Sequence, residues 1–310
     1  MISLVIPVYN EEKNVALLQQ KLSAVLSRLN REYEIIYVDD GSTDQTFIEL
    51  EKIQRQDTAH IKIIQFTRNF EKSAALMSGF SQAQGEIIIT MDGDLQDEPE
   101  EIHRFIEKLE AGYDCVTGWK VKRHDPFSKT FPSRIFNFLV AKISKLKIHD
   151  FNCGFKAYTR EAVLSLNLYG GLYRFIPAIL NAQGFKITEI GVLHHERKFG
   201  ISKYGAGRFI KGFFDITTLW VLLRFSQKPS HFFGNFGILS AVAGLLIIVL
   251  LYLAKFSYAI TISQHPYLFF IAIMMIIVGM QLFSIGILGE IIVSRHSDKR
   301  DYFRIKKVIK

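Results

Sequence analysis

The sequence predicts an α/β protein with a Rossmann-like, mostly parallel sheet that carries helices on both faces, followed by two membrane-spanning helices. Two observations predict this architecture. Short β-branched runs alternate with longer amphipathic stretches through residues 2–111, which is the spacing of repeated β–α–β units. Two stretches of about 20 mostly apolar residues, near 232–253 and 267–288, come later in the chain and are long enough to cross a bilayer.

The strands expected in the first part of the chain are residues 3–7, 33–38, 61–66 and 86–91. The helices expected there are residues 14–29, 43–56, 71–83 and 99–111. Ser42 or Thr43 suits the N-cap of the second helix, and Pro99 suits the first turn of the fourth. Because ligands of such sheets bind beyond the carboxyl ends of the strands, the residues that follow each strand are the candidates for a functional site.

Candidate ligand-binding residues follow these strands. They are Pro7, Tyr9, Asn10 and Glu11 after the first strand, Asp39 and Asp40 after the second, and Asp92, Asp94 and Gln96 after the fourth. The sequence contains no glycine-rich phosphate loop of the dinucleotide or P-loop type. Asp39 and Asp40 are therefore expected to accept hydrogen bonds from a ribose or a base, and a phosphate group would need a cation to enter this acidic edge.

The segment from Ile87 to Gln96 is suited to hold that cation. A buried, β-branched run ends in Asp92 and Asp94, and the amide of Gln96 follows. Carboxylate and amide oxygens suit Mg²⁺ or Mn²⁺, which keep some positions for water and phosphate. The alternative is a plain acidic turn, because Asp-Gly is a common turn pair.

Charge is unevenly distributed along the chain. Residues 1–100 contain 9 Lys and Arg against 17 Asp and Glu, whereas residues 101–310 contain 29 against 13. The basic part therefore faces an anionic partner, either a nucleic acid or a membrane surface. Its basic residues are interleaved with membrane-type apolar runs rather than base-stacking platforms, which argues against nucleic acid. Cys115 and Cys153 have no metal-ligand spacing and are expected to be reduced.

The two apolar stretches are expected to form a membrane hairpin within residues 229–290. Basic residues crowd the tail 291–310, while the connection between the spans holds only Lys255, so both termini are expected on the cytoplasmic face of the inner membrane. Residues 1–206 would form the cytoplasmic domain. Gly279, Gly286 and Gly289 would permit close helix packing, a homo-oligomer included, although the sequence alone does not show one.

Two further segments have the pattern of helices that lie in the headgroup region. Residues 131–148 combine apolar positions at helical spacing with Lys142, Lys145 and Lys147, and residues 207–228 carry a similar aromatic face. For each segment, the alternative is an ordinary amphipathic helix packed on its own domain.

The motifs at the strand ends resemble those of family-2 glycosyltransferases with the GT-A fold. The resemblance rests on residues 7–11, 38–44 and 92–96, on the segment Asp150–Tyr158, and on Arg197–Tyr204, which is similar to an Arg-x-x-Gly-x-Ser-Lys-Tyr motif. Together with the hairpin, these motifs resemble polyisoprenyl-phosphate glycosyltransferases, such as bactoprenol glucosyltransferases and dolichol-phosphate mannose synthases. The resemblance implies transfer of a hexose from a nucleotide-sugar donor, expected to be UDP-glucose, to undecaprenyl phosphate as the acceptor.

The reaction that the resemblance implies assigns further residues. Arg197, Ser202 and Lys203 would contact the donor from the side opposite Asp94. Asp150 is the candidate base, although a phosphate acceptor is largely dianionic at neutral pH and needs little help from a base. Lys122, Arg123 and Arg134, together with Lys120, would attract that phosphate. Attack by an external phosphate predicts inversion at the anomeric carbon.

Several alternatives stay open at this point. The motifs are equally compatible with GDP-mannose or a UDP-linked pentose as the donor, because the metal and pyrophosphate contacts would be the same. A processive polysaccharide synthase is disfavoured, since neither Trp119 nor Trp220 follows an arginine, as a Gln-x-x-Arg-Trp motif requires. A membrane scaffold that binds a nucleotide sugar without catalysis is the rival outside the enzymes.

Overall fold

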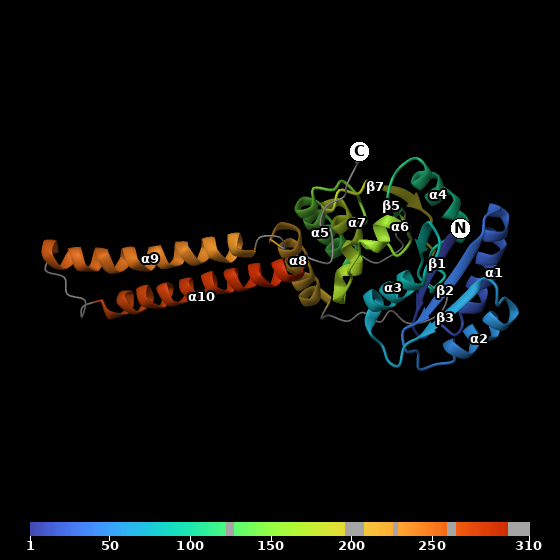
Figure 1. Ribbon diagram of the computed structural model, residues 1–310, viewed down its shortest axis with the longest axis horizontal. Coiled ribbons are helices and arrows are strands. Elements are labelled where there is room, and N and C mark those ends of the chain that lie inside the picture. The colour runs from blue at the N-terminus through green and yellow to red at the C-terminus, as the bar shows by residue number, and fades with distance from the viewer. Residues whose placement is uncertain (122–126, 196–207, 226–228, 259–264, 297–310) are drawn as a thin grey trace. The chain divides into compact units, whose positions relative to one another are not determined.

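The computed structural model describes residues 1–121, 127–195, 208–225, 229–258 and 265–296 (Figure 1). Its contacts divide the chain into a first unit, Met1–Leu219, and a second unit, Trp220–Lys310. The division falls within one helix. The predicted boundaries at residues 206/207 and 228/229 lie in or beside segments outside the described residues, and they stay predictions.

A seven-stranded sheet forms the centre of the first unit. The strands are β1 Ile2–Val8, β2 Tyr33–Asp39, β3 Ile61–Gln65, β4 Ile87–Thr90, β5 Cys115–Lys120, β6 Lys156–Thr159 and β7 Ile187–Val192. Their order is β3-β2-β1-β4-β6-β5-β7. Only β6 runs against its neighbours, so the mostly parallel sheet expected from the sequence is confirmed.

The helices between the first strands lie close to their predicted positions. They are α1 Val15–Leu26, α2 Thr46–Gln56, α3 Glu71–Gln82 and α4 Ile102–Glu110, with short 3₁₀ turns η1 Ser27–Leu29 and η2 Pro99–Glu101. The predicted start of α2 is wrong, because the helix begins at Thr46 rather than Thr43. Asp44 Oδ1 accepts hydrogen bonds from the Thr46 amide at 2.9 Å and from its hydroxyl at 2.5 Å, and residues before Thr46 form a loop instead.

Alternate residues of β1 pack on opposite faces of the sheet. Ile2, Leu4, Ile6 and Val8 join the main apolar core, which also takes side chains from α1, α2 and α4. Val5 points to the other face, where Gly79 of α3 approaches so closely that any larger residue would overlap it. This period of two explains why helices cover both faces, as the β-branched pattern predicted.

The rest of the first unit packs beside the sheet. Its elements are α5 Phe127–Ser144, α6 Arg160–Leu164, the 3₁₀ helix η3 Gly170–Phe175, α7 Ile176–Ala182 and the first part of α8 Arg208–Phe225. One side of α5 is buried, with Val140 fully covered and Phe136 stacked on Phe175 at 5.4 Å between ring centroids. The other side exposes Ile135, Phe138 and Leu139. The helix is therefore amphipathic.

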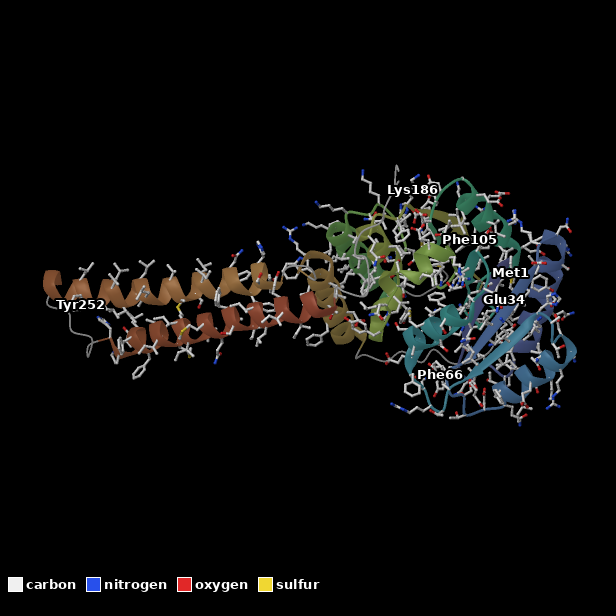
Figure 2. All side chains as sticks on the ribbon, in the orientation of Figure 1. Met1, Glu34, Phe66, Phe105, Lys186 and Tyr252 are labelled. Carbon is white, nitrogen blue, oxygen red and sulfur yellow. The ribbon has the colours of Figure 1, made fainter. Side chains whose placement is uncertain are left out.

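The second unit contains two long antiparallel helices, α9 Pro229–Tyr258 and α10 Pro266–His296 (Figure 1). Ser230–Ala254 and Pro266–Ile292 are long and apolar enough to cross a membrane. The helices meet through glycines: a Cβ on Gly237 would lie 2.5 Å from the Gly279 carbonyl oxygen, and the reverse substitution would be equally close. Where the amino end of α9 meets the last part of α10, Glu290 accepts a hydrogen bond from the Ser230 amide at 3.2 Å. Figure 2 shows mainly carbon among the side chains drawn on these helices.

A buried carboxylate ties together the amino ends of the strands, far along the sheet from the predicted site. Glu34, which is labelled in Figure 2, accepts hydrogen bonds from the Ser3 hydroxyl at 2.6 Å and from the Gln84 amide at 2.7 Å. Its other oxygen pairs with Lys62 at 2.6 Å. Burial alone would raise the pKa of Glu34, but Lys62 and the two donors outweigh it and lower the pKa below its ordinary value. The ionised form therefore stabilises the fold.

The substitution Glu34→Gln tests this assignment. Because the folded-state pKa is lowered, the stabilisation exists above the ordinary glutamate pKa and disappears as the pH falls through the folded value. We expect the variant to lower the apparent melting temperature of the full chain in detergent by about 4–8 °C at pH 7. The difference should shrink below about pH 4.5. Glu51→Gln, on the exposed face of α2, is the control and should change little.

Candidate active site at the carboxyl edge of the sheet

The loops that follow β1 and β2 are fastened to each other by side-chain hydrogen bonds. The Ser42 hydroxyl accepts from the Asn10 amide at 2.9 Å, and Asn10 Oδ1 accepts from the Thr43 amide at 2.8 Å. Asn10 has a φ of +54°, a left-handed conformation that asparagine tolerates better than most residues. The Glu11 amide donates to the Thr46 hydroxyl at 2.8 Å. Residues predicted to bind the donor from two separate loops therefore do lie together.

Asp39 and Asp40 end β2 and differ in their partners. Asp39 is fully buried; its Oδ1 accepts from the Ser42 amide at 3.0 Å, while its Oδ2 has no hydrogen-bond partner within the described part of the chain. Asp40 Oδ1 accepts from the Phe70 amide at 2.7 Å and so fixes the start of α3. Burial raises the pKa of Asp40, although the amides of Phe70 and Glu71 oppose the shift. Asp39 is the carboxylate with capacity for a ligand.

Asp92, just after β4, is held from two sides. Lys72 of α3 donates to its Oδ1 and forms an ion pair with it. On the other side, Gly154 packs so closely that a Cβ there would overlap the carboxylate. Burial would raise the pKa of Asp92, but Lys72, with help from Lys120 and Lys156, outweighs burial and lowers it. Asp92 therefore stays ionised.

Asp94 and Gln96 form the part of the site that suits a divalent cation. Asp94 is 7% exposed, and its Oδ1 accepts from the Gln96 amide at 3.2 Å. The Gln96 side chain donates its Nε2 to the His195 carbonyl at 3.1 Å, which orients its amide oxygen as the group for a cation. No cluster of three or more His, Cys, Asp or Glu side chains suited to a metal occurs among the described residues. Such a sparse donor set fits Mg²⁺ or Mn²⁺, which take substrate phosphate and water as further ligands.

Lys120, at the end of β5, is anchored in the site by a histidine. His194 Nε2 lies 3.2 Å from Lys120 Nζ, and His194 Nδ1 lies 3.3 Å from Asp97 Oδ1. Burial would lower the pKa of Lys120, but the Cys153 thiol and the nearby carboxylates outweigh burial and raise it. These carboxylates belong to Asp97, Asp92 and Asp150. A charged ammonium therefore sits among the candidate catalytic acids.

Asp150 lies in the loop before β6 and is almost completely buried. Its Oδ1 accepts from the Asn152 amide at 3.1 Å. The preceding residue, His149, stacks on Trp119 with ring centroids 4.1 Å apart, and both Glu189 oxygens accept from it, at 2.5 Å from Nδ1 and 2.7 Å from the amide. This clamp between β5 and β7 fixes the main chain at Asp150.

Other predicted residues cannot be placed in this way. Lys122, Arg123, Arg197, Ser202 and Lys203 lie outside the described residues, and Arg134 falls on α5. The sequence analysis did not identify Lys72 or His194 as site residues. Lys72 lies in the first turn of α3, which follows the carboxyl end of β3, so its position at the shared edge was the signal that could have found it.

Comparisons with known proteins agree on one family. The family model described as glycosyl transferase family 2 matches residues 3–166. Dodecaprenyl-phosphate galacturonate synthase of Rhizobium johnstonii is 34% identical over 98% of this chain and 89% of that protein. Undecaprenyl-phosphate 4-deoxy-4-formamido-L-arabinose transferase of Photorhabdus laumondii is 35% identical over 99% of this chain and 94% of that protein.

Solved structures agree on the fold. Glucosyl-3-phosphoglycerate synthase from Mycobacterium tuberculosis, in complex with Mn²⁺, uridine diphosphate and phosphoglyceric acid, superposes with a TM-score of 0.56 at 18% identity. The superposition covers 72% of this chain and 78% of that one. At this level of identity, the similarity supports the α/β fold alone.

Gly154→Ala tests the tight packing against Asp92. The added methyl group has to displace the Asp92 carboxylate, and a displacement of about 1 Å in a catalytic site can cost about 100-fold in rate. We expect the turnover of the full chain to fall by about that factor with little change in melting temperature. Gly212→Ala in α8 is the control, because an added Cβ there meets nothing within 4 Å. Unchanged turnover in Gly154→Ala would show that the position of Asp92 does not matter.

Proposed function

We propose that this chain, which belongs to glycosyl transferase family 2 and is a glycosyltransferase, moves a sugar from a nucleoside diphosphate sugar to polyprenyl phosphate. One observation carries the proposal. Two relatives match almost the whole chain, hairpin included, and both are named for a polyprenyl-phosphate acceptor. The strand-end carboxylates support it, because a nucleotide-sugar transferase needs oxygen ligands beside a nucleotide pocket.

The donor would lie along the edge of β1, β2 and β4. Asp39, with its buried Oδ2, is suited to accept a hydrogen bond from the base, and the loop of Tyr9, Asn10 and Glu11 would cover the nucleoside. Asp94 and Gln96 would hold Mg²⁺ or Mn²⁺, and a cation bound there supplies Lewis-acid stabilisation of the departing diphosphate. Arg197, Ser202 and Lys203 stay predicted contacts of that diphosphate.

The acceptor phosphate would approach beside Asp150. A phosphate monoester is largely dianionic at neutral pH, so it acts as a nucleophile without losing a proton to the protein. What it needs is positive charge, and Lys120, which interacts electrostatically with Asp150, would supply that charge. Lys122, Arg123 and Arg134 stay predicted acceptor contacts. Direct displacement at the anomeric carbon would invert its configuration.

The hairpin of α9 and α10 would anchor the enzyme where its lipid acceptor resides. Large apolar side chains face outward on both helices, for example Leu239, Leu250 and Phe270, which are 66%, 64% and 68% exposed. The exposed Ile135, Phe138 and Leu139 of α5 would rest on the same membrane, with Lys142 beside them. We place both termini on the cytoplasmic face of the inner membrane, from the basic tail.

The identity of the transferred sugar is the most specific part of the proposal. UDP-glucose is the donor that the family resemblance implies, although the motifs themselves do not specify the base or the sugar. The named relatives transfer galacturonate and 4-deoxy-4-formamido-L-arabinose, so donors that carry those sugars belong in the same comparison, along with GDP-mannose.

A transfer assay tests this function. Full-length protein in detergent would be incubated with undecaprenyl phosphate, Mn²⁺ and each radiolabelled donor in turn. We expect label to enter the lipid phase from one donor, and to fall by at least about 100-fold with EDTA or with Asp94→Asn. Glu51→Gln, a surface variant, should keep full activity. Donor binding without lipid label from any donor would favour the non-catalytic scaffold.

Lys120→Met tests the acceptor side separately. Because Lys120 is proposed to attract the phosphate dianion, its loss should raise the KM for polyprenyl phosphate by at least about tenfold and leave the donor KM within threefold. Lys120→Arg keeps the charge and should recover most of the loss. Lys52→Met, on the exposed face of α2, is the control. An increase in the donor KM alone would instead assign Lys120 to the donor.

A further inference from the structure

The ion pair between Lys72 and Asp92 gives one of the two acidic residues after β4 a fixed partner. Lys72 occupies Asp92 Oδ1, and the backbone at Gly154 closes the other side of the carboxylate. The side chains are 25% and 33% exposed, so the pair borders the site rather than being sealed in the core. A carboxylate held in this way keeps a single orientation.

The position of Lys72 depends on η3. The hydroxyl of Ser73, the next residue along α3, donates to the Gly170 carbonyl at 2.7 Å and accepts from the Tyr173 amide at 3.3 Å. Lys72 Nζ lies 5.4 Å from the centre of the Tyr173 ring, within the range of a cation–π contact. The start of α3 is therefore attached to η3 in two ways: through the η3 backbone at Gly170 and Tyr173, and through the aromatic ring of Tyr173.

The position of η3 depends in turn on α8. Arg174 Nη1 donates to Asp215 Oδ2 at 2.8 Å, with the two side chains only 14% and 20% exposed. Arg174 Nε also donates to the Tyr173 hydroxyl at 3.2 Å. Gly171 lies so close to Asp215 that a Cβ there would be 2.5 Å from the carboxylate. These contacts all lie in the first unit.

We propose that Lys72 is a positioning residue that holds the Asp92 carboxylate toward the transferred sugar, and that Arg174 and Asp215 set the position of Lys72 from α8. The proposal rests on the proposed function. It leaves the metal to Asp94 and Gln96, as in the proposed function. It also connects α8 with a carboxylate of the proposed site.

Lys72→Met tests the first step. If Lys72 positions Asp92 for the sugar, kcat should fall by about 100-fold while the donor KM changes less than threefold. Mn²⁺ binding in the presence of UDP, followed by electron paramagnetic resonance, should stay within threefold of wild type. Lys72→Arg keeps the charge and should recover at least tenfold. Lys52→Met is the matched control, because Lys52 pairs with Glu49 on an exposed helix face.

Arg174→Gln tests the second step through non-additivity. In the wild-type background, we expect Arg174→Gln to lower kcat by about tenfold. Asp215→Asn should lower kcat by a similar factor, because residues in contact couple strongly. In the Lys72→Met background, Arg174→Gln should cost less than twofold, because the residue through which it acts is already gone. Arg28→Gln, from an exposed ion pair with Glu100, is the control in both backgrounds.

Two results would overturn the proposal. Mn²⁺ bound at least tenfold more tightly by Lys72→Met would mean that Asp92 is a metal ligand for which Lys72 competes. An equal cost of Arg174→Gln in both backgrounds would mean that the pair with Asp215 acts independently of Lys72. Failure of the proposed function is distinct, because the wild-type chain would then transfer no sugar from any donor, whereas Mn²⁺ and UDP binding would still report on Lys72.

Discussion

Carboxylates at the carboxyl edge of the sheet have most of their surface removed from water, and much of the first unit is arranged to compensate that burial. A buried charge is costly unless hydrogen bonds or an opposite charge compensate it. Asp39 and Asp40 use main-chain amides, and Asp92 uses Lys72. The contacts of Asp40 and Asp92 also connect the segments that follow β2, β3 and β4, so the same bonds compensate the buried charge and shape the site.

Much of this arrangement could be predicted from the sequence, because local patterns encode it. The β-branched runs at residues 33–38 and 86–91 predict strands, and parallel strands bring their carboxyl ends to one edge whatever the loops contain. That rule is sufficient to bring Asn10 close to Thr43, which the hydrogen bond at 2.8 Å bears out. The membrane hairpin has a similarly local signal, since its length and apolarity can be read directly from the chain.

The parts that could not be predicted depend on contacts between distant segments. The antiparallel strand β6 enters the sheet between β4 and β5, and no local pattern specifies that insertion. Helix α2 starts at Thr46 rather than at Thr43 because Asp44 accepts hydrogen bonds from the Thr46 amide and hydroxyl. This local turn competes with the expected N-cap. Lys72 and His194 gain their roles only from partners 20 and 97 residues away along the chain.

The clearest consequence of these distant contacts is the different surroundings of Asp92 and Asp94. The two residues are separated by one glycine, and the sequence offers both as candidate metal ligands. In the fold, Asp92 is enclosed by Lys72 and Gly154, whereas Asp94 lies beside Gln96 and the segment that contains His195. A cation at Asp92 would be repelled by Lys72, whose ammonium already pairs with that carboxylate. Lys72 therefore gives Asp92 surroundings that the acidic motif alone does not specify.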